Sequence, residues 1–263
     1  MKNFNKYPHK EKQPQIPKLK INLFGYHAVH EAWLSPNRKI KKLFVTEKAV
    51  DNFLPYVEKA EELGLKRPKY QLVERRQIDK TLGQDVVHQG IAAYADPLPE
   101  MNTMDLLIKA ADKEKAIFVM LDQVTDPHNV GAIMRSACAF DLAGMVMQTR
   151  SAPRLEGVLG KVACGGLEHL PVALETNLSR SLEVFKENGY KCIALDERGE
   201  STIGDFSDVK KAVLVMGAEG KGLRPSVREA CTDVVRIEML GPLASINVSN
   251  AAAISFHTLM GGK

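Results

Sequence analysis

Two patterns of apolar residues alternate along the chain from residue 21 onward. Short continuous apolar runs such as IFVML and VLVM are typical of strands buried on both faces of a parallel sheet. Between them lie longer segments whose apolar residues recur every three to four positions, which is the period of a helix with one buried face. The alternation predicts an α/β protein whose helices cover a parallel sheet.

The first half of this pattern predicts a small α/β domain over residues 21–95. Ile21–Leu34 starts as a strand and turns at Gly25 into a helix, and a second helix over residues 53–64 ends at Gly64. Further strands are expected over residues 39–47, 70–74 and 87–95. Residues 96–101 contain two prolines and lose the periodicity, which indicates a linker.

Residues 102–263 predict a second, larger α/β domain that begins with a short helix capped by Asn102. Strands are expected over residues 116–122, 144–148, 170–174, 191–197, 212–217 and 234–239. Helices are expected over residues 103–113, 128–141, 154–163 and 177–189, with a last one after Ser245. In such sheets ligands bind where loops leave the carboxyl ends of the strands.

Composition narrows the class of protein further. No apolar run approaches the ~18 residues of a membrane span, so a cytoplasmic protein without a membrane segment is expected. The four cysteines form no C-x-x-C pair and none lies beside a plausible His ligand, so neither disulfides nor a metal site are expected. Residues 1–20 hold six Lys and one Glu and predict a basic disordered tail, which either solubilises the chain or tethers RNA phosphates.

Three segments of the larger domain carry candidate chemistry. They read LDQVTDPHNVGAIMR (121–135), VLVMGAEGKGLRP (213–225) and GPLASINVSNAAAISFH (241–257). In the first, Asn129 and Arg135 differ by six residues, about 600° of helix, so they do not share one helical face. The second is no Walker loop, but its glycines allow a close backbone approach to a flat ligand. In the third, Ser245 can cap the last helix and leave amides for a polar ligand group.

Together these segments resemble motifs one, two and three of the SpoU (TrmH-type) RNA ribose 2′-O-methyltransferases of the SPOUT superfamily, in the same order. The matching patterns are D-x-V-x-D-P-x-N-x-G-x-x-x-R, G-x-E-x-x-G and S-x-N-V-S, across roughly residues 115–260. The resemblance implies a parallel sheet with a deep C-terminal trefoil knot, which the periodicity does not reveal and which topology rules alone would disfavour. FGYHAV and VHQGIAA likewise resemble parts of the family's small ribosomal-protein-like substrate-binding domain.

The resemblance also implies roles for individual residues. Asn129 and Arg135 would engage the target ribose and adjacent phosphate, Glu219 would hold the polar network, and Ser245 and Asn247 would face the reacting groups. The adenosine part of S-adenosylmethionine would be held by backbone groups of Gly217, Ile237 and Ile246. From the residues alone, a helix with a surface Arg, a solvated Glu219 and a tightly packed last helix remain alternatives.

The function implied is S-adenosylmethionine-dependent 2′-O-methylation of RNA by a homodimer. The closest resemblance is to the 23S rRNA guanosine 2′-O-methyltransferases of the RlmB type. A tRNA ribose methyltransferase and a non-catalytic RNA-binding or ribosome-assembly protein are the alternatives. The segment KVACGG (161–166) is either an RNA-facing loop or a structural turn.

Overall fold

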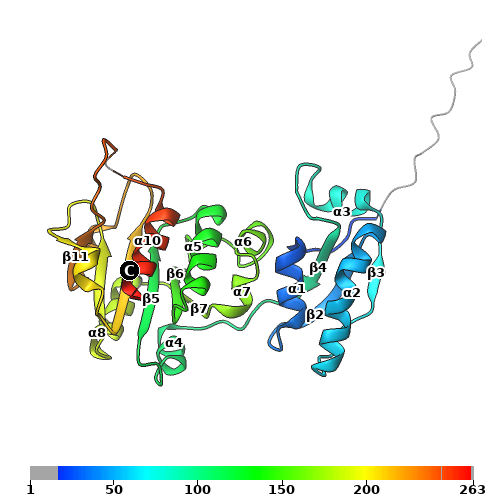
Figure 1. Cartoon of the computed structure of the whole chain (residues 1–263), viewed down its shortest axis with the longest axis horizontal. Coiled ribbons are helices and arrows are strands. Elements are labelled where there is room, and N and C mark those ends of the chain that lie inside the picture. Colours follow the sequence, from blue (N-terminus) through cyan, green and yellow to red (C-terminus); the bar gives the residue numbers. More distant parts are fainter. Residues whose placement is uncertain (1–16, 244, 262–263) are drawn as a thin grey trace, which may run out of the picture.

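The computed structural model describes residues 17–243 and 245–261, which form two sheets side by side with their helices (Figure 1). The first 16 residues of the predicted basic tail lie outside the described residues. Within the described part, the Leu19 amide donates to Thr81 Oγ1, on the helix Arg75–Leu82, over 3.0 Å.

The small sheet has four strands in the order β1-β4-β2-β3. Strand β4 runs antiparallel to β1 and β2, and β3 runs parallel to β2. The elements are β1 (Leu23–Phe24), α1 (Tyr26–Leu34), β2 (Ile40–Val45), α2 (Glu47–Glu62), β3 (Tyr70–Leu72), α3 (Arg75–Leu82) and β4 (Ile91–Ala95). The predicted strands and the turn from strand to helix at Gly25 are confirmed.

Two helices of the small half differ from the prediction. Helix α2 begins at Glu47 rather than at residue 53, because Ala49 and Phe53, one turn apart, face the core and extend the buried stripe backward. It also contains Pro55, which reads as a helix boundary in the sequence. Helix α3 was not predicted, because with Ile78 as its one buried residue it has no apolar stripe. A capping box between Glu74 and Gln77 supports its start.

The large sheet has seven strands, all parallel, in the order β7-β6-β5-β10-β8-β11-β9. They are β5 (Ala116–Asp122), β6 (Gly144–Gln148), β7 (Val172–Glu175), β8 (Lys191–Leu195), β9 (Ser201–Thr202), β10 (Lys211–Gly217) and β11 (Asp233–Arg236). The parallel α/β sheet predicted from the continuous apolar strands is therefore confirmed.

Helices cover both faces of the large sheet. One face packs, through side chains such as Val119 and Leu121, against helices that include α5 (Pro127–Ala139), α6 (Gly157–Val162), α7 (Gly166–His169) and α10 (Val248–Leu259). The other face packs, through Phe118 and Met120, against α4 (Thr103–Lys109), α8 (Leu178–Glu187) and α9 (Pro225–Glu229). A 3₁₀ turn, η1 (Ile203–Phe206), completes the half, and α5 lies between α10 and α6 (Figure 1).

The linker between the halves lies along the edge of the large sheet. Met101 forms a parallel bridge with Ala173 of the edge strand β7. Two residues further on, the backbone amide and the hydroxyl of Thr103 both donate to Glu175 Oε1 over 2.7 Å. Asn102 caps α4 as predicted, but the helix ends at Lys109, four residues earlier than expected. The linker is thereby anchored at its carboxyl end.

A buried ion pair joins the two halves where α1 packs against α6 and α7. Arg38 donates to Glu168 through Nη2 (2.7 Å) and Nε (3.0 Å), and the two side chains are 3% and 2% exposed. Arg38 Nη1 also donates to the Asp96 carbonyl over 3.0 Å. Because removal of one member would leave a buried charge unpaired, this contact fixes the relative orientation of the halves.

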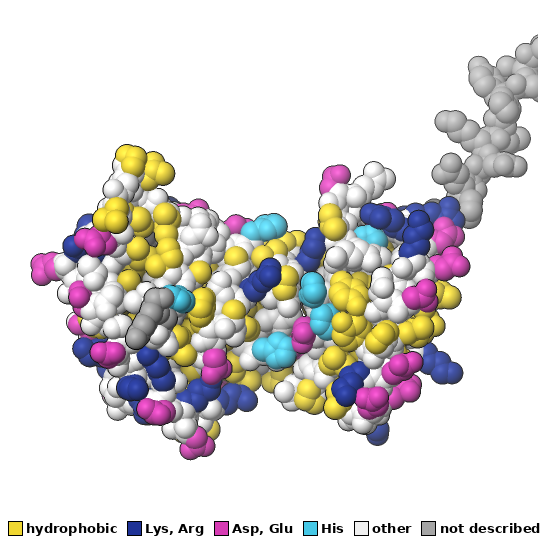
Figure 2. Space-filling model, in the orientation of Figure 1, with side chains coloured by type: hydrophobic (Ala, Val, Ile, Leu, Met, Phe, Trp, Pro, Cys, Tyr) yellow, Lys and Arg dark blue, Asp and Glu magenta, His cyan; other side chains and the backbone are white. Residues whose placement is uncertain are grey.

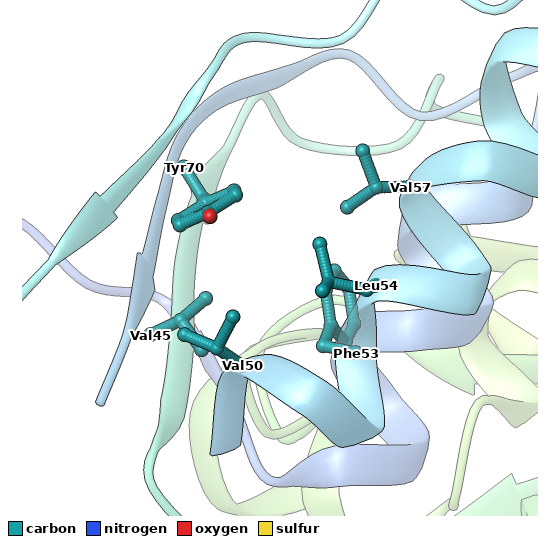
Figure 3. A pocket seen from close by; sticks show the side chains of 6 residues that line it. All are labelled: Val45, Val50, Phe53, Leu54, Val57 and Tyr70. Carbon is teal, nitrogen blue, oxygen red and sulfur yellow. The ribbon is translucent and has the colours of Figure 1, made fainter. Parts of the chain in front are cut away.

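A shallow hollow on the small half is lined by apolar side chains of α2, β2 and β3 (Figure 3). Its lining consists of Val45, Val50, Phe53, Leu54, Val57 and Tyr70. Apart from the Tyr70 phenol it contains no group that could act in acid–base or nucleophilic chemistry. This hollow is therefore not a candidate for catalytic chemistry.

Candidate active site

The carboxyl ends of β5 and β10 lie side by side and begin the candidate site. Asp122 and Gly217, the last residues of these strands, are register partners. The Asp122 carboxylate is fully buried and accepts from the backbone amide (2.9 Å) and the Nε (2.8 Å) of Arg224. This pair ties the far end of the turn after β10 to β5, so motifs one and two are held together at the predicted edge of the sheet.

The turn after β10 closes tightly on itself. A Cβ atom added at Gly217 would lie 2.2 Å from the carbonyl carbon of Gly222, so no other residue fits there without displacing the turn. The Gly222 amide donates to the Ala218 carbonyl over 2.8 Å. Glu219 is thereby placed at the exposed tip of a rigid turn.

Glu219 is the centre of a hydrogen-bond network that joins all three motifs. Its Oε1 accepts from Asn247 Nδ2 over 2.7 Å and from Asn129 Nδ2 over 3.3 Å. Asn247 Nδ2 also donates to Asn129 Oδ1 over 3.0 Å. Three residues predicted from separate motifs thus touch one another, and Glu219, although exposed, has side-chain partners from two of them.

Two helix starts hold the network in place. Asn129 lies in the first turn of α5, which begins at Pro127 with Asp126 as its N-cap. Asn247 is itself the N-cap of α10 and accepts from the Ser249 amide over 2.8 Å. The prediction that Ser245 caps this helix is therefore wrong, because the helix starts two residues later and the Asn247 amide supplies the acceptor.

A cavity of about 690 Å³ opens beside this network. It is lined by the turn Gly217–Gly222, the segment Ser245–Val248 and the segment Leu195–Arg198 that follows β8. Among the predicted cofactor residues, Gly217 and Ile246 line this cavity. Ile237 packs half-buried against the core of the same sheet face instead and is not part of the lining.

One wall of the cavity was missed in the sequence. Asp196 follows β8, accepts from Arg198 Nε (2.9 Å) and Nη2 (2.8 Å), and its side chain is 5% exposed. These hydrogen bonds, helped by the charge of Arg228, lower the pKa of Asp196 to about 2. The available signal was a charged segment, DERG, directly after a buried strand, which is where ligands bind in parallel sheets.

Arg135 lies apart from this network. It is exposed and lines a second cavity of about 310 Å³ together with His27 and Glu31 of α1 and His169 of α7. The structure therefore brings Glu219, Ser245 and Asn247 to one cavity, with Asn129 hydrogen-bonded to Glu219 and Asn247, and it brings Arg135 to another. This agrees with the positions of Asn129 and Arg135 on different faces of one helix.

Two further properties bear on the class of protein. Among residues 17–243 and 245–261, no group of three or more His, Cys, Asp or Glu side chains could hold a metal ion. In the same part of the chain, the helices are too short or too polar for any of them to cross a bilayer.

Comparison with known proteins assigns the family. Residues 116–257 match the SpoU rRNA methylase family, and residues 23–101 match the RNA 2′-O ribose methyltransferase substrate-binding domain. The chain is 36% identical over 239 residues to the putative TrmH family tRNA/rRNA methyltransferase YacO of Bacillus subtilis (strain 168), covering 89% of this chain and 93% of that protein. The chain belongs to the SpoU rRNA methylase family.

A second relative and a solved structure extend the comparison. An uncharacterized tRNA/rRNA methyltransferase of Mycobacterium leprae is 36% identical over 182 residues, which span 69% of this chain but only 59% of that protein. The fold is similar to that of the SpoU methyltransferase AviRb from Streptomyces viridochromogenes in complex with AdoMet, with a TM-score of 0.74 and 19% identity over 90% of this chain and 88% of that one.

Proposed function

We propose that the protein transfers a methyl group from S-adenosylmethionine to a ribose 2′-hydroxyl of RNA, most specifically a guanosine of cytoplasmic 23S rRNA. The observation that carries the proposal is the Asn129–Glu219–Asn247 network at the mouth of the 690 Å³ cavity. In this assignment residues 21–95 bind RNA, residues 102–263 form the methyltransferase domain with its trefoil knot, and residues 96–101 link them. Residues 1–20 would tether RNA phosphates.

The cavity suits the proposed cofactor. The tight turn at Gly217–Gly222 offers backbone groups to a flat ring, and Ile246 adds an apolar contact. Because Arg198 forms an ion pair with Asp196, the wall at residues 195–198 does not require an anionic ligand. Two structural relatives, AviRb and an rRNA methyltransferase of Sinorhizobium meliloti, are described as bound to AdoMet, which supports the same ligand here.

The residues of the network would orient the hydroxyl for attack. S-adenosylmethionine, when bound, would supply an electrophilic methyl group to the ribose oxygen and leave as its demethylated thioether, and the hydroxyl proton would pass to solvent. An amide can accept the hydroxyl hydrogen and donate to its oxygen, so Asn129 and Asn247 can both orient it. Glu219 fixes both amides, and Arg135 would bind the neighbouring phosphate and stabilise the growing negative charge.

A homodimer is part of the proposal. The segment between β11 and α10 projects from the molecule, and apolar side chains gather at its tip (Figures 1 and 2). Leu240 is 95% exposed and Leu243 75% exposed. Apolar side chains presented in this way favour association with a second copy. Sedimentation of the wild type and of Leu240→Lys tests this directly.

Mapping of 2′-O-methylation in RNA from cells with and without the protein tests the proposed reaction. One ribose methylation in 23S rRNA should disappear, and purified protein should restore it with S-adenosylmethionine alone. Loss of a tRNA methylation instead would establish the tRNA alternative. Loss of none, together with normal RNA binding, would establish a non-catalytic RNA-binding protein.

A further inference from the structure

The cavity between the two halves carries charged side chains that the active-site network does not use. It is formed where α1 of the small half faces α5 and α7 of the large half. Glu31 and Arg135 both line it, so a carboxylate and a guanidinium share one cavity of about 310 Å³. These groups ordinarily form a strong two-point ion pair when they can meet.

Glu31 does not pair with Arg135; instead, an imidazole lies against each of its two oxygens. Oε1 lies 3.0 Å from His30 Nε2 and Oε2 lies 2.7 Å from His169 Nε2. Burial alone would raise the pKa of Glu31, but the hydrogen bond from His169 and the charges of His30 and His169 outweigh it and lower the pKa. The carboxylate therefore stays ionised and directed at the two rings.

The backbone of the large half holds Glu31 in this position. A Cβ atom at Gly165 would lie 2.3 Å from Glu31 Cγ, and Gly165 has a φ of +93°, so the carboxylate stem rests directly on this glycine. The preceding residue, Cys164, is also left-handed, with a φ of 49°. The KVACGG segment thus turns against Glu31 and also lines the cavity through Ala163, Cys164 and Gly166, so both alternatives for it stay open.

Arg135 is left as the available cation of the cavity. In the described chain it has no hydrogen bond or ion pair, and the side chain is exposed. It lies six residues beyond Asn129 on α5, a rise of roughly 9 Å at ~1.5 Å per residue. Because the two residues lie on different faces of α5, Arg135 offers a phosphate contact away from the Asn129 network rather than beside it.

We propose that the His30–Glu31–His169 bridge keeps Arg135 free to bind an RNA phosphate in the cavity between the halves. His169 is then a positioning residue: it acts on the substrate through Glu31, and the contact with RNA is made by Arg135. The inference rests on the proposed function for its ligand, an RNA strand. It adds a role for the small half, whose Glu31 must stay bound to the two histidines so that it does not pair with Arg135.

Binding of a short single-stranded RNA at several salt concentrations, followed by fluorescence anisotropy, tests the bridge. In His169→Ala, Glu31 is released to pair with Arg135, so affinity should fall about 3- to 10-fold. The slope of log K against log salt should flatten by roughly 0.7, the value of one phosphate contact on a single strand. His169→Gln keeps a donor for Glu31 and should bind as the wild type does.

The double variant His169→Ala/Glu31→Gln separates the proposed role from simple loss of a contact between the halves. It removes the carboxylate as well as its partner, so affinity and salt slope should return to wild-type values. Failure of Glu31→Gln to restore binding, or wild-type binding by His169→Ala, would overturn the inference.

Methyl transfer, measured in parallel, distinguishes this inference from the proposed function. Wild-type protein that binds RNA in the predicted way but transfers no methyl group would contradict the enzyme and leave the bridge standing. Wild-type protein that methylates RNA while His169→Ala keeps its affinity and salt slope would contradict the bridge alone. Wild-type protein that binds no RNA would overturn both.

Discussion

The two cavities beside the candidate residues are built in different ways. The larger, about 690 Å³, lies beside the Glu219 network, which Asn129 joins from the first turn of α5. It is lined by segments that follow strands of one sheet. The smaller, about 310 Å³, lies beside Arg135 and needs both halves of the molecule. The first is therefore a property of the parallel sheet, whereas the second depends on how the small half docks.

The two cavities also differ in whether their polar side chains are paired. Around Glu219 the polar groups of three motifs satisfy one another, so that site is ordered before any ligand arrives. Beside Arg135 the carboxylate is occupied by imidazoles and the guanidinium is not. A satisfied network orients a small group, while an unpaired cation attracts a charged chain from solution.

The largest effect is expected from Arg38→Ala, which should disturb the smaller cavity and leave the larger one intact. It strands the buried Glu168 carboxylate, at a cost of about 3–5 kcal/mol in stability. Chemical denaturation should show the loss, and calorimetry should show unchanged S-adenosylmethionine affinity. Arg38→Met/Glu168→Leu removes both charges and should recover most of the stability. If cofactor affinity falls together with stability in Arg38→Ala, the two cavities are not independent.

Arg135→Ala should lower the single-turnover rate of methyl transfer on the order of 10²-fold, as removal of a charge-stabilising donor does in other enzymes. Arg135→Lys should also be badly impaired, because an ammonium lacks the planar fork that matches phosphate. The melting temperature should change little, since the side chain is exposed and unpaired. Arg180→Ala, an exposed arginine on α8 across the sheet, is the matched control. A near-normal rate in Arg135→Ala would mean that the smaller cavity does not take part in methyl transfer.

Asn247→Ala should affect the larger cavity alone. It removes the N-cap of α10, worth about 1 kcal/mol, and two hydrogen bonds across the motifs. We expect a modest loss of stability, slower methyl transfer, and RNA binding with the wild-type salt slope. Asn247→Asp keeps the cap acceptor but places a second carboxylate against Glu219, so it should recover neither the rate nor the full stability. A changed salt slope in either variant would link the cavities.

The smallest effect should follow pH. Since the folded state holds the pKa of Asp196 at about 2, below its ordinary value near 3.8, the unfolded chain binds more protons between these values. The stability contributed by Asp196 is therefore complete above about pH 4 and is lost as the pH falls toward 2. Denaturation at pH 6, 4 and 3 should show a shallower decline for Asp196→Asn than for the wild type. Equal slopes would mean that Asp196 is not held in its charged form by Arg198.

The sequence predicts the parts of the larger cavity that hold Gly217 and Ile246, but it misses residues 195–198 and wrongly adds Ile237. Strands β5 and β10 are parallel neighbours and end at Asp122 and Gly217. The motif residues that follow them therefore lie at the same edge of the sheet. The cap of α10 was misplaced by two residues because Ser and Asn are comparable N-caps. The cavity beside Arg135 was not predicted, since nothing in the periodicity of α1 tells that His27 and Glu31 will face α5 and α7.

The bridge between Met101 and Ala173 has a consequence for solubility. A seven-stranded parallel sheet would normally expose a row of unpaired backbone groups at each side, where another chain could add itself and start aggregation. At one side the end of the linker runs beside β7, and Met101 pairs with some of its exposed backbone groups. At the other side β9 is only two residues long, too short to template a further strand. The connection between the halves therefore also shields the sheet from unwanted association in a crowded cell.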